Sequence, residues 1–307
     1  MPLGPPIPLP GRPFAPYGTR ATRPDQPPGT RVGRVRTWVN GELLTDPEAP
    51  AVTATDHGLT VGDGVFEVIK AVAGRPFALD LHLERMARSA AGFGLPVLDT
   101  EAVRRGVTAV LEGERQPLVR VRATSTAGPA PLGSDRGAGP PSLVVVSGVM
   151  DPWPETAAVV TVRWPRNERG ALAGLKTTSY GENVRALARA HERGASEAIF
   201  ANLQGWLCEG TGTNVFYVVD GELRTPTLRS GCLAGITRHL VLEWHGAVEV
   251  DAPIDEILHA SEIFLTSTTR DVQGIHRWND RQLTVPGPVT TEVTKVWRRR
   301  EPELLGA

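Results

Sequence analysis

Short apolar segments joined by tight-turn signals place the strongest limit on how this chain can fold. RTWV and ELL flank Asn40-Gly41, and VFYVV and ELRTP flank Asp220-Gly221. Asn-Gly and Asp-Gly tolerate the positive φ angles of two-residue hairpin turns, so both pairs of segments are predicted to form antiparallel hairpins. GVFEVIKAVAGRPFAL predicts a third hairpin, which turns at Gly74. The chain must therefore contain antiparallel sheet.

Segments with helical periodicity alternate with these strands. In LDLHLERMARSAAGFGL, apolar residues recur at Leu81, Met86 and Ala90, which predicts an amphipathic helix. Helices are also predicted in EAVRRGVTAVLEG, ENVRALARAHERG, GITRHLVLEW and PVTTEVTKVWRRR, with a short one in IDEILHA. Further strands are predicted in PLVRVRATST, SLVVVSGVM, AVVTVRW, EAIFAN and EIFLTST. This order indicates an α+β (mixed α/β) fold rather than a regular βαβ series.

The length of 307 residues, with 40% hydrophobic content, is enough for two domains that each bury a core. Residues 1–34 are rich in proline and lack apolar periodicity, so we expect an extended or disordered tail or a misplaced start. Pro152 and Pro154 mark a boundary. We predict a small α/β domain over 35–150, a linker over 151–157 and a larger domain over 158–307, with a cleft between the two domains.

Composition excludes several classes of function. A net charge of -1, with scattered arginines, gives no reason to expect binding to nucleic acid or to an anionic membrane. No apolar run approaches the length of a membrane span, and the N-terminus lacks the basic-then-apolar order of a signal peptide, so a cytoplasmic protein is expected. Cys208 and Cys232 do not form a CxxC motif, and the histidines lack metal-ligand spacing, so no metal site is predicted. Small molecules are the expected partners.

Lysine is nearly absent from the chain. Of 33 Lys and Arg residues, only Lys70, Lys176 and Lys295 are lysines. A chain that takes its positive charge from arginine needs lysine where a primary amine must lose its proton and form a Schiff base, which guanidinium cannot do. The alternative is that three lysines merely survived a drift in composition. The segment GLKTTSYGEN around Lys176 makes this residue the candidate nucleophile.

Two other segments carry possible binding groups. Glu209 in WLCEGTGTNVFYVV directly precedes a flexible Gly-rich turn, where a carboxylate can face a cationic ring nitrogen; a solvated turn residue is the plain alternative. The apolar strand that follows excludes a dinucleotide fingerprint, which requires a helix there. Gly235, Ile236 and Thr237 begin a predicted helix, whose free N–H groups can bind an anion, or Thr237 acts only as an ordinary cap.

Hydroxyl groups and an arginine offer further anion ligands. Ser267, Thr268 and Thr269 follow a predicted strand, although such a run is also typical of a plain turn. His82 and Arg85 share a helix face, from which Arg85 could grip a phosphate unless it is a surface residue. An aldehyde held by lysine, a ring nitrogen facing a carboxylate and a phosphate at a helix N-terminus together describe pyridoxal phosphate.

These segments, in this order, resemble the class IV aminotransferases, the fold-type IV pyridoxal-phosphate enzymes. The resemblance runs from Arg36 to the C-terminal helix and includes DHGLTVGDGVFE, HLERM, the LK pair at 175–176, CEGTGTNVF, GITR and FLTSTT. It implies a small α/β lobe joined to a larger pseudo-barrel lobe. It also implies an active site between the lobes that a second subunit completes, so a homodimer is expected.

The resemblance also implies residue roles. Lys176 carries the cofactor and shuttles the proton during catalysis, and Glu209 keeps the pyridine nitrogen protonated. The implied phosphate ligands are Arg85, Ile236, Thr237 and Thr268. Tyr180 follows the lysine by four residues, where branched-chain members of the family have a tyrosine at five, so its contact with the cofactor is a weaker expectation.

The substrate is expected to be a D-amino acid, with a 2-oxo acid as acceptor and R-configured primary amines as further donors. Phe66-Glu67 resembles the transaminases, and the TSTT run, with Thr269 near the substrate carboxylate, resembles the D-amino acid branch. The Arg-x-His pair of that branch is missing, so Arg136 is predicted to replace it as carboxylate clamp. Two alternatives stay open: 4-amino-4-deoxychorismate lyase, and branched-chain L-amino acid aminotransferase.

Overall fold

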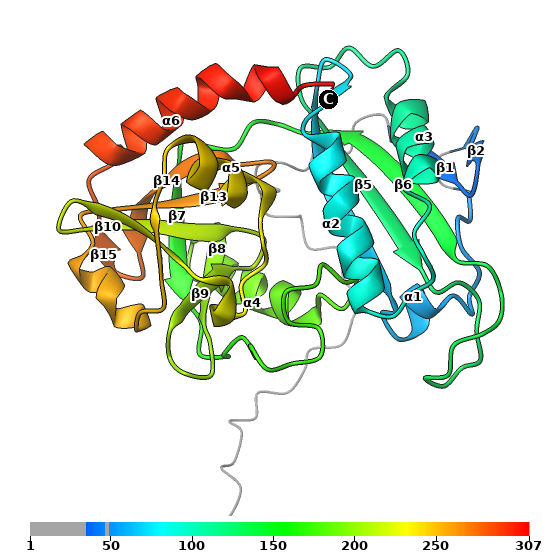
Figure 1. The fold of residues 1–307 in the computed structure, drawn as a ribbon, viewed down its shortest axis with the longest axis horizontal. Coiled ribbons are helices and arrows are strands. Elements are labelled where there is room, and N and C mark those ends of the chain that lie inside the picture. The colour runs from blue at the N-terminus through cyan, green and yellow to red at the C-terminus, as the bar shows by residue number, and fades with distance from the viewer. Residues whose placement is uncertain (1–34, 47–48, 307) are drawn as a thin grey trace, which may run out of the picture.

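The protein folds into two lobes, each built around its own sheet (Figure 1). The computed structural model describes residues 35–46 and 49–306, so the expectation for the tail over 1–34 lies outside the described residues. Strands of the first sheet come from the chain before residue 150, and those of the second from the chain after residue 155. The mixture of helices with mostly antiparallel sheets confirms the α+β prediction.

The first sheet is antiparallel throughout, in the order β2-β1-β6-β5-β3-β4. Its strands are β1 (Arg36–Val39), β2 (Glu42–Leu43), β3 (Gly64–Val72), β4 (Arg75–Pro76), β5 (Val119–Thr126) and β6 (Ser142–Val149). Asn40 and Gly41 turn the first hairpin with φ angles of 48° and 112°, and Gly74 turns the second with 79°. Both hairpins predicted for this lobe are confirmed.

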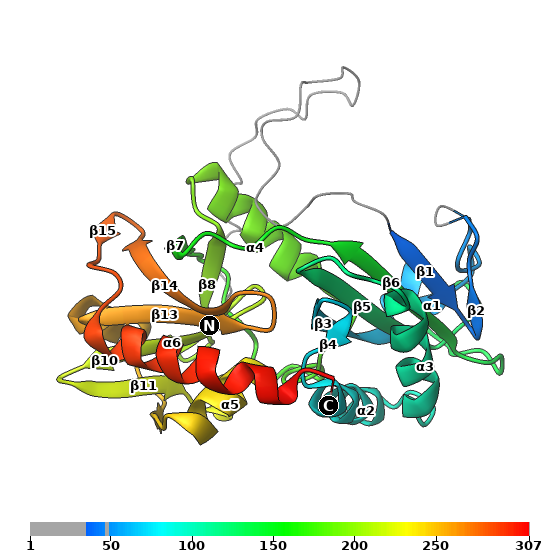
Figure 2. The same ribbon diagram turned by 90° about the horizontal axis from the view of Figure 1, so that it is seen from above.

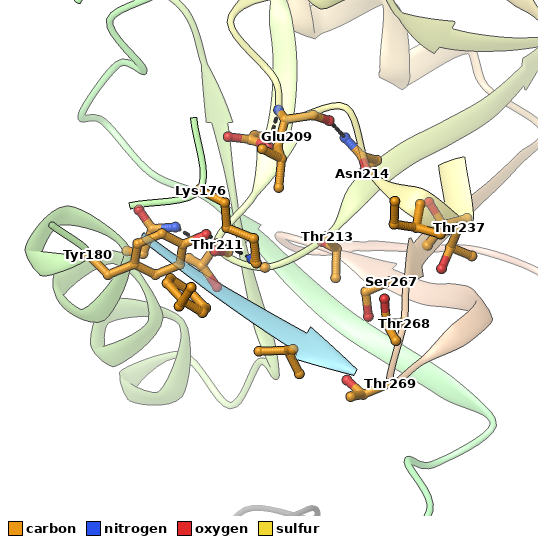
Figure 3. Close-up of a pocket in the computed structure, with 18 of the residues that line it drawn as sticks. Lys176, Tyr180, Glu209, Thr211, Thr213, Asn214, Thr237, Ser267, Thr268 and Thr269 are labelled. Atoms are coloured by element: carbon orange, nitrogen blue, oxygen red, sulfur yellow. Dashed lines mark hydrogen bonds between the residues drawn. The ribbon is translucent and has the colours of Figure 1, made fainter. Parts of the chain in front are cut away.

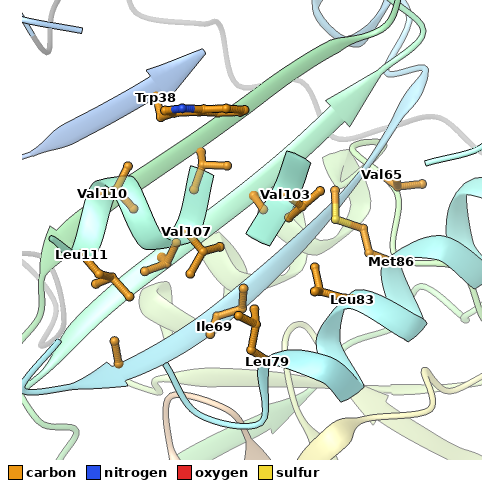
Figure 4. Close-up of a cluster of buried hydrophobic side chains, with 14 of the residues drawn as sticks. Trp38, Val65, Ile69, Leu79, Leu83, Met86, Val103, Val107, Val110 and Leu111 are labelled. Carbon is orange, nitrogen blue, oxygen red and sulfur yellow. The ribbon is translucent and has the colours of Figure 1, made fainter. Parts of the chain in front are cut away.

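One face of this sheet forms the core of the first lobe. Helices α2 (Leu79–Gly92) and α3 (Thr100–Leu111) cover it, and their apolar side chains pack on the inward residues of β3 and β5 (Figure 4). Val119, Val121 and Ala123 of β5 belong to this core. Successive strand residues point to opposite faces, so Arg120 and Arg122 point away from it, toward the second lobe. The short helix α1 (His57–Thr60), which precedes β3, was not predicted.

The second sheet curls into a partial barrel. Its strands run in the order β12-β11-β10-β13-β14-β7-β8-β9, with β15 paired to β14. The sheet curls because β9, the last strand in this order, packs against β10 and β11 near its other end. The strands are β7 (Thr156–Thr161), β8 (Glu197–Ala201), β9 (Leu207–Gly210), β10 (Asn214–Val219), β11 (Glu222–Pro226), β12 (Val248–Val250), β13 (Glu262–Ser267), β14 (Asp271–Trp278) and β15 (Arg281–Gln282). Because β7 begins at Thr156, the last two residues of the expected linker belong to the sheet.

Helices surround the curled sheet. The helix α4 (Gly181–Glu192) packs on β8, whereas α5 (Ile236–Trp244) and α6 (Pro288–Arg300) cover β13. Short 3-10 helices are η1 (Leu228–Ser230), η2 (Ile254–His259) and η3 (Glu301–Leu304), so the helix expected in IDEILHA is a 3-10 helix. The hairpin at Asp220-Gly221 is confirmed.

None of the helices in the described part of the chain combines the length and apolarity that a bilayer crossing requires.

The C-terminal segment ties the lobes together. Figure 2 shows α6 lying along the second lobe and leading toward α2 of the first. The backbone N–H of Ala78 donates to Leu304 O at 2.8 Å, and that of Gly306 donates to Pro76 O at 2.7 Å. Buried Lys70 of β3 donates to carboxylates of Asp271 and Glu301, both in the second half of the chain. These contacts fix β3 relative to the turn that follows β13.

Gly106 provides a test of the first core. It lies within α3, where glycine costs about 1 kcal/mol relative to alanine. A Cβ atom there would lie 2.7 Å from Val145 Cγ2 and 2.8 Å from Trp38 Cε3. We therefore expect Gly106→Ala to lower the free energy of unfolding by about 1–3 kcal/mol despite the gain in helix propensity. Urea denaturation measures this change, and Gly148→Ala, where a Cβ meets nothing within 4 Å, should be close to neutral. Equal stability of the two variants would contradict the close packing at α3.

Candidate active site

Lys176 lies on a loop that pairs with β3 of the first lobe. Val65 and Thr177 form an antiparallel bridge, Phe66 N donates to Lys176 O at 3.0 Å, and Thr178 N donates to Gly64 O at 2.8 Å. This edge of β3 is open because β4 pairs only with Ala71 and Val72 at the far end of the strand. The catalytic candidate is thus held by backbone hydrogen bonds between the lobes.

A cavity of about 500 Å³ opens around Lys176 between the lobes (Figure 3). Figure 3 shows Lys176 with Tyr180 on one side and the hydroxyl groups of Thr237 and Thr268 on the other. The cavity brings together nine of the ten predicted site residues: Phe66, Arg85, Lys176, Tyr180, Glu209, Ile236, Thr237, Thr268 and Thr269. Arg136 is not among the lining residues.

Aromatic rings surround the amine of Lys176. Its Nζ lies 3.3 Å from Tyr180 Oη and 4.4 Å from the centre of the Phe66 ring, and the two rings meet edge to face at 4.9 Å. No carboxylate forms an ion pair with this amine among the described residues, whereas Lys70 pairs with two carboxylates and exposed Lys295 lies 3.9 Å from Glu292. Among the described residues, Lys176 is therefore the lysine whose amine is not engaged by a carboxylate.

Glu209 lies on β9, with its carboxylate held at two points. Oε2 accepts a hydrogen bond from Leu233 N at 2.9 Å, and Oε1 lies 3.2 Å from Arg166 Nε. Burial raises the pKa of the Glu209 carboxyl above its ordinary value, and the opposing effects of Arg166 and the Leu233 N–H are smaller. A cation bound in the cavity would favour the ionised carboxylate, which suits the side chain to a protonated ring nitrogen.

The N-terminus of α5 forms the opposite wall of the cavity. Gly235 is the N-cap and supplies no side-chain cap, so the first N–H groups, including those of Ile236 and Thr237, lack a helical acceptor. The buried Thr237 Oγ1 also has no hydrogen-bond partner. A Cβ at residue 235 would lie 2.0 Å from Asn214 Oδ1, so only glycine fits there. These unpaired donors fit a phosphate group.

Arg85 reaches this wall from α2 and is anchored by Glu67. Its Nε and Nη2 each donate to a carboxylate oxygen of Glu67 at 2.7 Å, and Nη1 donates to Ala234 O at 3.1 Å. His82 Nδ1 lies 2.8 Å from the same carboxylate, and His82 Nε2 lies 3.4 Å from Thr268 Oγ1. Burial alone would raise the pKa of Glu67, but Arg85 and His82 hold it well below its usual range. The anchoring role of Glu67 was not predicted from the sequence.

Arg136 is not placed at the cavity, so its predicted role as carboxylate clamp is not supported within one chain. Its Nε and Nη2 donate to Asp63 at 2.8 and 2.6 Å, and the guanidinium also donates to the carbonyls of Phe93 and Gly94. This pairing lowers the pKa of Asp63. The physical reason is that a neighbouring carboxylate and two carbonyls already satisfy the arginine.

Arg120 and Arg122 line the cavity instead, and the sequence reasoning missed them. The Cζ of Arg122 lies 3.6 Å from the centre of the Phe66 ring. Within the described residues neither guanidinium takes part in a hydrogen bond or ion pair, and burial lowers the pKa of both. The sequence signal is the alternation of valine and arginine in VRVR. Successive side chains of a strand point to opposite faces, so if the valines face the core, the arginines face away from it.

The described residues contain no group of three His, Cys, Asp or Glu side chains that could hold a metal ion.

Comparison with known proteins places this site in a family. The family model for class IV aminotransferases matches residues 64–278. The D-alanine aminotransferase of Bacillus licheniformis is 31% identical over 83% of this chain and 93% of its own length. A fold IV transaminase from Curtobacterium pusillum is 30% identical, with a TM-score of 0.77, over 85% of this chain and 98% of that one. A branched-chain aminotransferase from Thermoproteus uzoniensis is 27% identical, with a TM-score of 0.81, over 88% of this chain and 98% of that one.

The chain belongs to the class IV aminotransferase family and has the fold of the fold-type IV transaminases. It is a pyridoxal-phosphate-dependent enzyme that uses an amino donor and a 2-oxo acid acceptor. The cavity fits this cofactor, because unpaired donors at α5 can hold a phosphate while Lys176 and Glu209 line the same space.

Arg85 supplies a test of this site. Arg85→Ala leaves the buried Glu67 carboxylate without its main partner, so we expect the free energy of unfolding to fall by about 3–5 kcal/mol and cofactor affinity to fall with it. The stability contributed by Glu67 is complete above pH 4.5, its ordinary pKa, and is lost as the pH falls, because its pKa in the folded state is depressed. Thermal denaturation and cofactor titration measure the two effects.

The double variant Glu67→Gln/Arg85→Ala separates the two effects. It removes the unpaired charge and should regain part of the stability, whereas cofactor affinity should stay low. Arg88→Ala, on an exposed position of the same helix, is the matched control. Full recovery of cofactor affinity in the double variant would show that Arg85 does not contact the phosphate.

Proposed function

We propose that this enzyme transfers the amino group of D-amino acids to 2-oxo acids. The observation that supports this most strongly is the unpaired guanidinium of Arg122, stacked on Phe66 beside Lys176, because such a group is suited to hold a substrate carboxylate. The D configuration is supported by the Ser267–Thr269 run at the cavity wall and by the similarity to a D-alanine aminotransferase. R-configured primary amines are expected as weaker donors.

Five groups of the chain would hold the cofactor. The N–H groups of α5, with Thr237, Thr268 and Arg85, would bind the phosphate, and Glu209 would face the ring nitrogen. When bound, pyridoxal phosphate supplies an aldehyde that takes up an amino group and a ring that withdraws electrons from the substrate Cα. The ionised Glu209 carboxylate, fixed by Leu233 N–H and Arg166, would keep a proton on that nitrogen.

Lys176 would move the proton at the substrate Cα. Its amine must be neutral to accept a proton, and it lies between the Tyr180 hydroxyl and the Phe66 ring. Tyr180 Oη, at 3.3 Å, orients the amine. Backbone pairing of residues 176–178 with β3 fixes the main chain of Lys176 next to Phe66.

Arg122 takes the place of Arg136 as the proposed clamp for the α-carboxylate. A homodimer, in which the partner covers the mouth of the cleft, is part of the proposal, and membership of the family supports it. The main alternative is 4-amino-4-deoxychorismate lyase, an activity that needs the same lysine and cofactor site.

Substitutions of Lys176 and of Glu209 should have different effects on catalysis. Lys176→Ala is expected to abolish transamination, because no other amine lies in the cavity among the described residues. Glu209→Gln should retain the cofactor and lower kcat on the order of 10²-fold or more, because an amide cannot hold the ring nitrogen protonated. Steady-state kinetics with dialysed protein measure both. A normal kcat in Glu209→Gln would show that Glu209 takes no part in the mechanism.

The substrate assay decides between the proposed function and its alternative. D-Alanine with 2-oxoglutarate should yield pyruvate, and L-alanine should yield far less. Aminodeoxychorismate is supplied in a parallel reaction. Release of p-aminobenzoate from it, together with no pyruvate from D-alanine, would establish the lyase.

The clamp is tested by Arg122→Gln. It should raise KM for D-alanine on the order of 10- to 100-fold, the cost of losing a hydrogen bond to a charged group, and should affect a carboxylate-free amine much less. Arg136→Gln is the comparison variant. Equal KM increases for both classes of donor would exclude Arg122 as the clamp.

A further inference from the structure

Lys70 is a buried lysine that the proposed reaction does not use. It lies on β3, and its side chain is 3% exposed. Phe66, Val68 and Lys70 are alternate residues of this strand, so they share one face. Phe66 and Val68 line the catalytic cavity, and Lys70 lines a neighbouring cavity of about 650 Å³. A lysine is rarely buried unless its charge is paired, so the partners of Lys70 show what it holds in place.

Two carboxylates accept hydrogen bonds from the Lys70 amine. Asp271 is the first residue of β14, and Glu301 begins η3 near the C-terminus. Asp271 closes the turn between β13 and β14, whereas Glu301 belongs to the C-terminal segment. Asp271 is therefore the partner that connects Lys70 to this turn.

The turn that Asp271 closes carries two wall residues of the catalytic cavity. Ser267 pairs with Asp271 across the turn, and Thr268 and Thr269, which lie between them in the chain, line the cavity. Asp271 has a φ angle of 55°, the left-handed conformation that ends many three-residue hairpin loops. Its backbone thus shapes the turn, and its side chain attaches the turn to Lys70.

The strand β3 also holds the turn at a second point. Thr268 Oγ1 lies 3.4 Å from His82 Nε2 of α2, and His82 Nδ1 lies 2.8 Å from the carboxylate of Glu67 on β3. The turn therefore contacts β3 once through His82 and Glu67 and once through Asp271 and Lys70. Two attachments fix the orientation of a short turn, whereas a single one leaves it free to pivot.

We propose that Lys70 and Asp271 are positioning residues, whose ion pair holds the 267–271 turn so that Thr268 and Thr269 face the cofactor phosphate and the substrate. The inference rests on the proposed function in placing the phosphate at Thr268. Among the described residues that line the catalytic cavity, neither Lys70 nor Asp271 is present, so both act through the turn. Lys70 thereby has a task distinct from that of Lys176.

The binding test compares the two carboxylates that share the Lys70 amine. Asp271→Asn keeps the size of the side chain and its tolerance of positive φ but removes the charge. In equilibrium dialysis it should raise the Kd for pyridoxal phosphate on the order of tenfold. Glu301→Gln removes the other carboxylate and leaves the turn attached, so this matched control should stay within about twofold of the native Kd. A native Kd in Asp271→Asn, or equal increases in both variants, would overturn the proposal.

Asp271→Gly separates the side chain from the backbone of the turn. Glycine adopts the left-handed conformation readily but has no carboxylate. If the ion pair positions the turn, Asp271→Gly should raise the Kd as much as Asp271→Asn does. A native Kd in Asp271→Gly would show that the backbone conformation suffices and that the ion pair positions nothing.

The pH dependence of this effect is a readout that a merely structural role would not move. Burial raises the pKa of Asp271 to about 6, a rise that Glu301 increases and Lys70 opposes. The other charged residues that line this cavity are Glu155, Arg270, Lys295 and Arg298. Because the pKa is raised, the ionised form that pairs with Lys70 predominates above pH 6 and is lost as the pH falls.

The difference in Kd between the native chain and Asp271→Asn should therefore be complete near about pH 7.5 and nearly absent near about pH 5. Titration of the cofactor phosphate affects both proteins alike and cancels in this comparison. A difference that stays constant over this range would contradict the proposal.

Thr268→Ala distinguishes a failure of this inference from a failure of the proposed function. It should raise the Kd for pyridoxal phosphate, because it removes a phosphate ligand. An unchanged Kd would overturn the placing of the phosphate at Thr268, and the inference with it. A raised Kd in Thr268→Ala together with a native Kd in Asp271→Asn would leave the phosphate site standing and refute the positioning role alone.

Discussion

The antiparallel bridge between Val65 and Thr177 is the contact on which the site depends. It adds the lysine-bearing loop of the second lobe to the open edge of a strand in the first. Two backbone hydrogen bonds, from Phe66 N and Thr178 N, fix the loop in register. Because β3 also carries Phe66, this pairing places the backbone of Lys176 beside the aromatic ring that its amine contacts.

The two faces of the first sheet perform different tasks. Its inner face forms an apolar core with α2 and α3, and its outer face presents Arg120 and Arg122 to the cleft. The anchoring carboxylate of Glu67 points inward, where it is buried with Arg85. Buried charges such as those of Glu67 and Arg85 are tolerated only when paired. Arg120 is partly exposed and Arg122 is exposed to the cleft, so both guanidinium groups are accessible to an anion there.

Local signals in the sequence predicted most of the fold. The hairpins at Asn40-Gly41 and Asp220-Gly221 follow from turn chemistry, and the main helices follow from their periodicity. The strand β14 was missed because DVQGIHRW does not alternate apolar and polar residues, although it pairs with β13 and β7 on both sides. Only the neighbouring strands of the tertiary structure stabilise that segment as sheet.

The candidate site was predicted where motif and chemistry agreed. Lys176, Glu209 and the α5 N-terminus converge on one cavity, as the sequence suggested. The substrate clamp was assigned to Arg136 because it was the only cation in its loop, but side-chain pairing with Asp63 cannot be deduced from sequence distance. The residues Arg120 and Arg122 become candidates only when the sheet shows which face of β5 meets the second lobe.

The measurement that tests the account most directly is the location of the cofactor on the chain. Borohydride reduces the bond between the cofactor's aldehyde and a lysine amine to a stable link, which peptide mapping by mass spectrometry locates. The label is expected on Lys176, in the peptide that bridges to β3. A label on Lys70 or Lys295 would contradict the assignment of the cavity as the active site.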